Sequence, residues 1–466
     1  MLFNSVQFLL SFSAFIVAYW LLPQRWRNLA LFIGSYVFYG MWDWRFLSLL
    51  AISTIVDFEV GRRLAEARPP TYRKLLLSLS MTVNLGMLGI FKYFNFFVDN
   101  FVDLLDRVGL APNTPLLQVL LPVGISFYTF QTMSYTIDAY RGQIAPVRRF
   151  VDFATYVSYF PQLVAGPIER ARVLLPQITA DQRSLSTESV GSGLGLVLMG
   201  LVKKVVLADG VAAVADRLYD DPAGASTITA LLGIVAFSLQ IYGDFAGYTD
   251  IARGVSRLLG IELSLNFSQP YLARNITEFW RRWHISLSNW LRDYLYISLG
   301  GNRKGTLRTY AHLMITMLLG GLWHGASWNF VVWGGLHGLY LVVHKLTRKG
   351  VVSPQAPAWR DVPAIAVTFS VVSLTWIFFR SPDFSTSFEV IRALARPGDW
   401  SQADALLVAL ATLGALALDL ASRRRWFTYQ LIVNRPAAAG AMSMAALLAI
   451  VMFSGDAPRP FVYFQF

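Results

Sequence analysis

The sequence predicts an all-α polytopic membrane protein, and three observations carry this prediction. Hydrophobic residues make up 55% of the 466 residues and charged residues only 15%, against about 45–50% and about 25% in soluble globular chains. The mean hydropathy is +0.47. Several uncharged runs reach the roughly 18 residues that cross a hydrocarbon core as a helix. We therefore expect roughly 10–12 transmembrane helices, with re-entrant and interfacial helices beside them.

The first apolar run extends from Ser5 to Leu22 and stops at Pro23. It has neither the basic start nor the small-residue cleavage site that a secretory signal peptide needs. We therefore expect a retained first span, and a mature chain that starts near Met1.

The other candidate spans follow at intervals along the whole chain. They are residues 29–42, 75–91, 116–137, 190–202, 226–242, 314–343, 362–379, 405–418 and 437–454. No polar stretch between them reaches the roughly 50 residues of a separate soluble domain. We expect a single membrane domain over residues 1–466. No internal repeat is visible, which counts against an inverted-repeat transporter.

The net charge of +12 comes from basic clusters between apolar runs, notably in segments 62–74 and 423–425. This pattern is typical of cytoplasmic loop ends beside anionic lipid, so we expect membrane lipid as a partner and no nucleic acid. The chain has no cysteine. Disulfides, thiolate zinc sites and a cysteine acyl-enzyme intermediate are therefore excluded.

Segment 266–304 combines many cations with tryptophan and is neither a clean span nor an ordinary loop. At helical spacing, an apolar face is formed by Trp280, Trp283, Leu287, Trp290 and Tyr294. Beside it runs a polar stripe of Arg281, His284, Ser288 and Arg292. The tryptophans favour an interfacial helix anchored at the headgroups. The stripe favours binding of the phosphates of a nucleotide-containing substrate, and Glu278 is placed to pair with Arg282 at i,i+4.

The run 314–343 contains no charged residue, and its titratable groups are His324, His337 and Tyr340. Apolar surroundings disfavour imidazolium, so His324 is expected to be neutral at pH 7, as a general base must be. The glycines around His324 permit close approach of backbone or substrate, let the helix break, and predict a cavity there. A core histidine bonded to a neighbouring helix explains His324 equally well at this point. We interpret His337 as structural.

Polar residues also lie within the apolar run 240–250, among them Gln240 and Asp244. An intramembrane aspartate needs a partner, so Asp244 is either a proton-relay group or, as we favour, the structural partner of an arginine. The segment 161–170 contains two prolines and a glycine, which predict a re-entrant segment in place of a regular helix.

Motifs that are absent narrow the chemistry further. The chain has no Gly-x-Ser-x-Gly elbow, no His-Glu-x-x-His, no P-loop and no Gly-x-Gly-x-x-Gly. Hydrolase, protease and kinase functions lose support. The residues favour chemistry that needs one base and a well-held activated donor, such as attack of a hydroxyl on a thioester.

Five segments together resemble the membrane-bound O-acyltransferase family, in particular its bacterial branch that acetylates exported polysaccharides such as alginate. They are residues 160–170, 240–252, 279–296, 322–329 and 461–466. The resemblance implies that His324 is the catalytic histidine and that His284 holds the second signature position. Many eukaryotic members carry asparagine there, so the role of His284 as acid, base or orienter stays open.

The resemblance also implies a helical body around a central tunnel, in the bacterial inner membrane. Acetyl-CoA is the expected donor substrate and enters from the cytoplasm, while the acceptor enters from outside; no bound cofactor and no metal are expected. A periplasmic partner protein is expected to receive the acetyl group and modify the polysaccharide. The residues expected to bind substrate or donor are Arg281, Arg282, Ser288, Arg292, Lys304, Trp323, Asn329, Gln240 and Asp244.

Three alternatives stay open. Within the same class, the acceptor is cellulose or peptidoglycan, or the acyl group is D-alanine for teichoic acid. In a different class, the protein is a transporter or flippase in which Asp244 and the histidines form an intramembrane relay. A purely structural scaffold is the third alternative.

Overall fold

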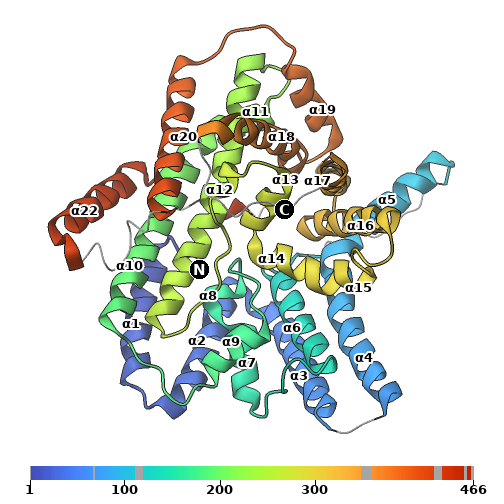
Figure 1. Ribbon diagram of the computed structural model, residues 1–466, viewed down its shortest axis with the longest axis vertical. Helices are drawn as coiled ribbons and strands as arrows, with labels where there is room; N and C mark the ends of the chain where they lie inside the picture. The colour runs from blue at the N-terminus through green and yellow to red at the C-terminus, as the bar shows by residue number, and fades with distance from the viewer. Residues whose placement is uncertain are drawn as a thin grey trace. The chain divides into compact units, whose positions relative to one another are not determined.

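The computed structural model describes residues 2–66, 69–110, 119–347, 359–423, 433–455 and 459–462. Every regular element in these ranges is a helix (Figure 1), which confirms the all-α prediction. Internal contacts divide the chain into two compact units. The N-terminal unit contains Phe3–Ser184 and Leu259–Leu263, and the C-terminal unit contains Leu185–Leu258 and Ser264–Phe466. A single membrane domain stays a prediction.

The N-terminal unit is built from helices of which α1 lies close to its expected boundaries, whereas α3 and α5 were not among the expected spans. They are α1 (Val6–Leu21), α2 (Gln24–Asp43), η1 (Trp44–Phe46), α3 (Leu47–Leu64), α4 (Pro70–Leu88), η2 (Gly89–Tyr93), α5 (Phe94–Arg107), α6 (Ile125–Tyr140), α7 (Phe150–Ser158), α8 (Phe160–Leu163) and α9 (Ala171–Ile178). Between α8 and α9 the backbone is irregular, as the prolines of this segment predicted.

A buried carboxylate ties three helices of the N-terminal unit together. Asp57 on α3 is inaccessible to solvent. It accepts hydrogen bonds from the hydroxyl of Ser80 and, at 2.7 Å, from the amide of Asn84, both on α4. Thr136 on α6 donates to it at 3.1 Å. Neutral donors from two neighbouring helices thus compensate much of the cost of burying this side chain.

The C-terminal unit contains the longer helices. They are α10 (Thr187–Leu201), η3 (Val202–Ala208), α11 (Asp209–Asp220), α12 (Thr227–Leu258), η4 (Pro270–Leu272), α13 (Ile276–Arg282), α14 (Ile285–Trp290), η5 (Leu291–Tyr296), α15 (Ile297–Leu299), α16 (Thr306–His324), α17 (Trp328–Thr347), η6 (Trp359–Asp361), α18 (Val362–Arg380), α19 (Phe384–Ala393), α20 (Gln402–Arg423) and α22 (Pro436–Phe453).

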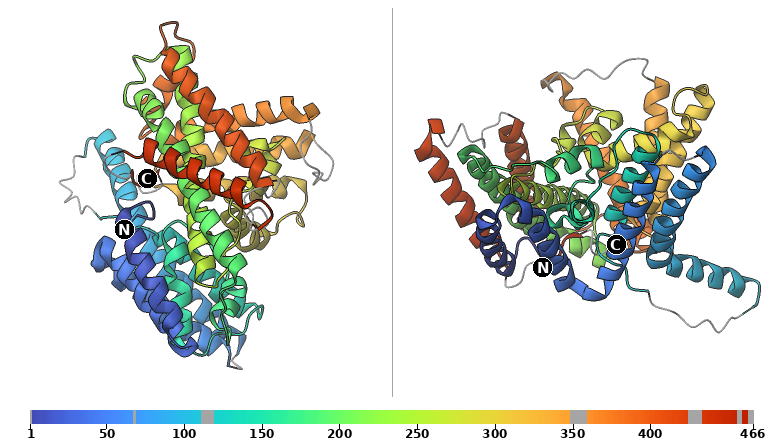
Figure 2. Two further views of the ribbon diagram at one scale, coloured as in Figure 1. Left: turned by 90° about the vertical axis from the view of Figure 1, so that its left-hand side faces the viewer. Right: turned by 90° about the horizontal axis from the view of Figure 1, so that it is seen from below.

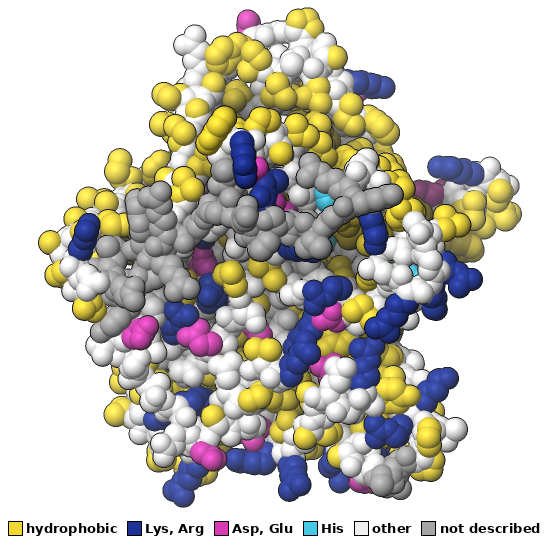
Figure 3. Space-filling model, viewed as in Figure 1, with side chains coloured by type: hydrophobic (Ala, Val, Ile, Leu, Met, Phe, Trp, Pro, Cys, Tyr) yellow, Lys and Arg dark blue, Asp and Glu magenta, His cyan; other side chains and the backbone are white. Residues whose placement is uncertain are grey.

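Within the described residues, five helices are long and apolar enough to cross a membrane. They are Pro70–Arg107, Thr227–Leu258, Trp359–Arg380, Gln402–Ser422 and Pro436–Phe453. Val6–Leu21 is a shorter apolar helix. Hydrophobic side chains also cover much of the face in Figure 3, and on α22 several are more than half exposed. These features confirm a polytopic membrane protein, while the count of 10–12 spans and the tunnel stay predictions.

Helix α12 forms the centre of the C-terminal unit, and it is longer than the span 226–242 expected from the sequence. Its partner α10 approaches so closely that a side chain has no room between them. A Cβ at Gly247 would lie 2.6 Å from the carbonyl oxygen of Gly200, and one at Gly200 would lie 2.5 Å from that of Gly247. Small residues thus allow two backbones to touch, as is common between membrane helices.

The apolar run 314–343, one candidate span in the sequence, is two helices in the structure, and the helix break that the glycines around His324 allow is confirmed. Helix α16 ends at His324, and α17 begins at Trp328. The two helices pack side by side (Figure 2). The cause is Gly325, whose extended backbone, at φ −158° and ψ 150°, interrupts helical geometry.

Candidate functional site

The C-terminal unit brings the two predicted catalytic histidines next to each other. His324 is the last residue of α16 and is 5% exposed, while His284 lies between α13 and α14 and is fully buried. Their ring centroids are 6.3 Å apart, with an angle of 62° between the rings. A side chain at the end of α16 and one from the turn between α13 and α14 therefore meet inside the protein, which a pair acting on one substrate requires.

The backbone at His284 is in the left-handed region, at φ 42° and ψ 56°. A residue with a side chain adopts this conformation at a cost of about 1–3 kcal/mol, so the surroundings must hold it. Asn266 does so. Its Oδ1 lies 3.2 Å from His284 Nδ1 and accepts from both the backbone N–H and the hydroxyl of Ser286. The sequence reasoning did not assign Asn266 this role.

Aromatic rings surround the buried imidazole of His284. The ring of Phe245, from α12, lies 4.7 Å away in an edge-to-face arrangement, and that of Trp323, from α16, lies 6.0 Å away. Burial lowers the pKa of His284 to about 3. This imidazole is therefore neutral at physiological pH and is able to form hydrogen bonds without carrying a positive charge.

The left-handed turn also breaks the amphipathic helix that the sequence predicted over 280–294. Helix α13 ends at Arg282, α14 ends at Trp290, and a wider π-helical turn, η5, follows. Each break resets the phase of the side chains, so a regular 3.6-residue stripe does not exist. Trp283 and Trp290 are buried inside the protein, which corrects their assignment as headgroup anchors.

The predicted basic stripe is therefore divided. Arg281 and Arg292 of the stripe are exposed, as is Lys304 beyond it, whereas His284 is buried in the interior. Arg292 donates to the neighbouring Asp293 at 2.6 Å. The Ser288 hydroxyl donates to the carbonyl of Trp283 at 3.2 Å.

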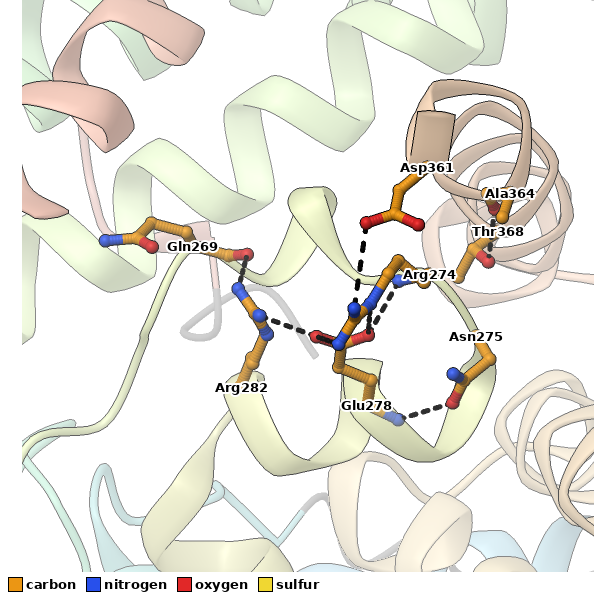
Figure 4. A network of polar contacts seen from close by, with 8 residues as sticks. All are labelled: Gln269, Arg274, Asn275, Glu278, Arg282, Asp361, Ala364 and Thr368. Carbon is orange, nitrogen blue, oxygen red and sulfur yellow. Dashed lines mark hydrogen bonds and ion pairs between the residues drawn. The ribbon is translucent and has the colours of Figure 1, made fainter. Parts of the chain in front are cut away.

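Glu278 is the centre of an ion network at the start of α13 (Figure 4). Its Oε2 lies 2.9 Å from Arg274 Nε, and its Oε1 lies 2.6 Å from a terminal nitrogen of Arg282. The predicted i,i+4 pairing with Arg282 is confirmed. Burial alone would raise the pKa of the Glu278 carboxyl, but the bonds from Arg274 and the charge of Arg282 hold it below its ordinary value. Asn275 caps the same helix by accepting from the Glu278 N–H at 2.9 Å.

The glycines near His324 serve the close packing of α16 on α17. A Cβ at Gly325 would overlap the ring of Phe330, and one at Gly321 would overlap its carbonyl oxygen. The predicted close approach of backbone is confirmed. The occupant beside these two glycines is Phe330, where the sequence reasoning expected a cavity.

Aromatic rings from three helices enclose His324. The centroid distances are 5.0 Å to Trp323, 5.1 Å to Trp333 and 5.4 Å to Phe379. The buried Asn329 donates to the Ser381 carbonyl at 2.9 Å and so fastens the start of α17 to the end of α18.

His337 lies on α17, about two helical turns after Asn329. It is fully buried, and its Nε2 lies 3.0 Å from the Thr375 hydroxyl. These contacts agree with its interpretation as a structural residue.

The polar residues of α12 face a pair of lysines that the sequence reasoning missed. Lys204 on η3 lies 2.7 Å from Asp244, and Lys203 lies 2.6 Å from Asp250. Asp244 thus has a cationic partner, as expected, but that partner is a lysine and not an arginine. Gln240 lies one turn before Asp244 on α12 and is 8% exposed. The sequence did contain a signal for this partner, namely two adjacent lysines within the apolar segment 202–208.

The second oxygen of Asp244 binds a distant part of the chain. Its Oδ2 accepts from the backbone N–H of Val462 at 2.6 Å. The adjacent Phe461 packs 5.4 Å from the ring of Phe245, which in turn contacts His284. Of the motif at 461–466, residues 463–466 lie outside the described residues.

Comparison with known proteins gives the family of the chain. The model of the membrane-bound O-acyltransferase (MBOAT) family matches residues 137–379, which include both histidines. A probable alginate O-acetylase AlgI of Azotobacter vinelandii is 42% identical over 425 residues, covering 90% of this chain and 83% of that protein. The protein of the same name from Pseudomonas putida is 39% identical, with both chains covered completely. A peptidoglycan O-acetyltransferase of Helicobacter pylori is 36% identical over 84% of this chain and 80% of its own. The chain therefore belongs to the membrane-bound O-acyltransferase family, and it is a multi-pass O-acyltransferase of the bacterial inner membrane.

Proposed function

We propose that this protein transfers acetyl groups from acetyl-CoA, on the cytoplasmic side, toward an exported polysaccharide, and that this polysaccharide is alginate. The buried pair of His324 and His284 is the observation that carries the proposal. Relatives named alginate O-acetylase, which cover almost the whole chain, support the acyl group and the acceptor.

In this proposal His324 is the general base. It takes the proton of the attacking hydroxyl while the oxygen bonds to the thioester carbonyl carbon, and it returns the proton to the departing thiolate. Its position at the carboxyl end of α16 favours this role, because the helix dipole stabilises the imidazolium that forms. The neutral His284 assists by orienting the hydroxyl or His324.

The donor's phosphates are assigned to Arg281 and Lys304. Both are exposed, and neither forms an ion pair with another described residue. Arg282 and Arg292 are held by Glu278 and Asp293, so they contribute to the positive field rather than to direct contact. The other residues of the predicted donor site, such as Asn329 and Asp244, act by supporting the helices around the histidines.

The acceptor side is assigned to a periplasmic partner protein. The described residues form membrane helices and short connections, without a large external domain that grips a polymer. The proposed partner accepts the acetyl group, which passes through the tunnel, and places it on the sugar.

The test is incorporation of labelled acetyl into polysaccharide by cells that carry His324→Ala at normal expression. We expect incorporation to be lost. The matched control is His344→Ala on α17, a half-buried histidine that lies 2.9 Å from the Thr277 hydroxyl. Unchanged incorporation by His324→Ala would contradict the catalytic assignment.

Peptidoglycan is the second candidate acceptor, because one relative is named for it. Cells or extracts supplied with each polymer separate the two candidates by the polymer that becomes labelled. Movement of solute in reconstituted vesicles without consumption of acetyl-CoA would instead favour a transporter.

A further inference from the structure

Trp333 carries a buried hydrogen-bond donor without an acceptor among the described residues. Its side chain is 1% exposed, and its indole Nε1 forms no hydrogen bond in that part of the chain. Nearly all buried donors in proteins are satisfied, since an unmade hydrogen bond costs free energy. An orphaned N–H of this kind is free to donate to a bound group.

The ring of Trp333 lies directly against the proposed base. Its centroid is 5.1 Å from that of His324, and the two planes are nearly perpendicular at 85°. Two other aromatic residues contact the ring of His324: Phe379 has no polar hydrogen, and Trp323 is the residue before His324 on α16. Trp280 also has a buried indole nitrogen without a partner within the described ranges, but its ring contacts Trp333 and His337.

The surroundings hold Trp333 in a fixed position. Trp376 stacks on it at 5.7 Å and 22°, and the rings of His337 and Phe379 contact it at 4.7 Å and 5.2 Å. The next residue, Gly334, approaches α16 so closely that a Cβ there would overlap the Met317 carbonyl oxygen. A donor that is already immobile requires no reorganisation when charge develops next to it.

We propose that the Trp333 indole N–H is the oxyanion donor of the acyl transfer, so that Trp333 is a catalytic residue; this rests on the proposed function. When the hydroxyl oxygen bonds to the thioester carbonyl carbon, the carbonyl π electrons move to its oxygen, and the hydroxyl proton moves to His324. The Trp333 N–H donates to the oxyanion. The C=O bond then re-forms, the carbon–sulfur bond breaks, and the thiolate takes the proton from His324 as the free thiol.

The test compares rates of acetyl-CoA consumption by membranes that contain the protein and a polysaccharide acceptor. Free thiol is measured with a thiol reagent against membranes that lack the protein, and the protein itself adds no cysteine to this background. Trp333→Phe should lower kcat about 10²–10³-fold, the usual loss for one oxyanion donor, with little change in KM. Trp376→Phe removes the same atoms, including a buried indole N–H, from the ring that stacks on Trp333, so it measures the loss of packing and of a donor outside the proposed oxyanion site and should lower kcat only a few-fold.

A second substitution guards against misfolding. The sulfur analogue of tryptophan, β-(3-benzothienyl)alanine, incorporated in place of Trp333, keeps the shape of the ring and lacks only the N–H. It should lower kcat to the same degree as Trp333→Phe. A kcat within threefold of the wild-type value for this analogue, or a loss that Trp376→Phe equals, would overturn the assignment. Retained transfer in His324→Ala would instead overturn the proposed function, so the two failures are distinguishable.

Discussion

Replacing Lys204 with methionine tests how the C-terminal unit stabilises its buried carboxylates. The ammonium of Lys204 lies 2.7 Å from Asp244 and 2.8 Å from Asp209, and the three side chains are 7%, 1% and 15% exposed. Removing one partner from a buried ion pair typically costs about 3–5 kcal/mol, because the other charge stays buried without compensation. Lys204→Met leaves two carboxylates in this condition, so we expect a loss at the upper end of that range.

Asp244→Asn is the matched comparison, and it should cost less. Lys204 keeps Asp209 as a partner, and an asparagine oxygen still accepts from the Val462 N–H. The expected loss is about 1.5–3 kcal/mol, the usual contribution of a hydrogen bond to a charged group. The double variant should be more stable than Lys204→Met alone, because it removes one of the two buried carboxylates that have lost their cationic partner.

Equilibrium unfolding in detergent micelles, followed by tryptophan fluorescence, measures these free energies. The reasoning requires the order wild type, Asp244→Asn, double variant and Lys204→Met, from most to least stable. If the Lys204→Met variant is as stable as the Asp244→Asn variant, the reasoning is refuted, because the lysine would then not be compensating two charges.

Three further predictions concern the site. Gly325→Ala places a methyl group against Phe330 and should cost about 1–3 kcal/mol of stability and most acetyl transfer, whereas Gly335→Ala, whose Cβ meets its nearest neighbour at 3.5 Å, should be tolerated; equal stability of the two variants in thermal unfolding would contradict this. Asn266→Ala should lower kcat at least about tenfold by releasing the left-handed backbone of His284, whereas the helix cap variant Asn275→Ala should lower only stability; kinetics of both variants decide it. The lowered pKa of Glu278 stabilises the fold fully above its ordinary value of 4.5, and this contribution disappears as the pH falls through the folded-state pKa. The difference in stability between wild type and Glu278→Gln, measured from pH 8 to pH 3, should therefore be constant above about pH 5 and vanish in acid.

Features that depend on local spacing were predictable from the sequence. The apolar runs predicted the class of fold, and i,i+4 spacing predicted the ion pair of Glu278 with Arg282. The identities of His284 and His324 came from their motifs and not from any physical signal of proximity.

Features that depend on tertiary contacts were not predictable in the same way. The helix break at His284 exists because Asn266 forms a hydrogen bond with its side chain across a loop. No local sequence pattern predicts such a hydrogen bond. The glycines around His324 indicated that the run 314–343 can break, but the exact point of the break, at Gly325, depends on the fit of Phe330. The partner of Asp244 was misassigned because an intramembrane charge shows only that a cation is needed, not which one.

The hydrogen bond between Asp244 and Val462 joins residues 218 positions apart. During synthesis, α12 therefore enters the membrane long before the backbone group that completes its bonding exists. Lys204 precedes α12 in the chain and is available at once, so it shields the carboxylate while the rest of the protein is made. The C-terminal unit consequently reaches its final packing only after residue 462 has been added, and assembly of the histidine site is coupled to completion of the polypeptide.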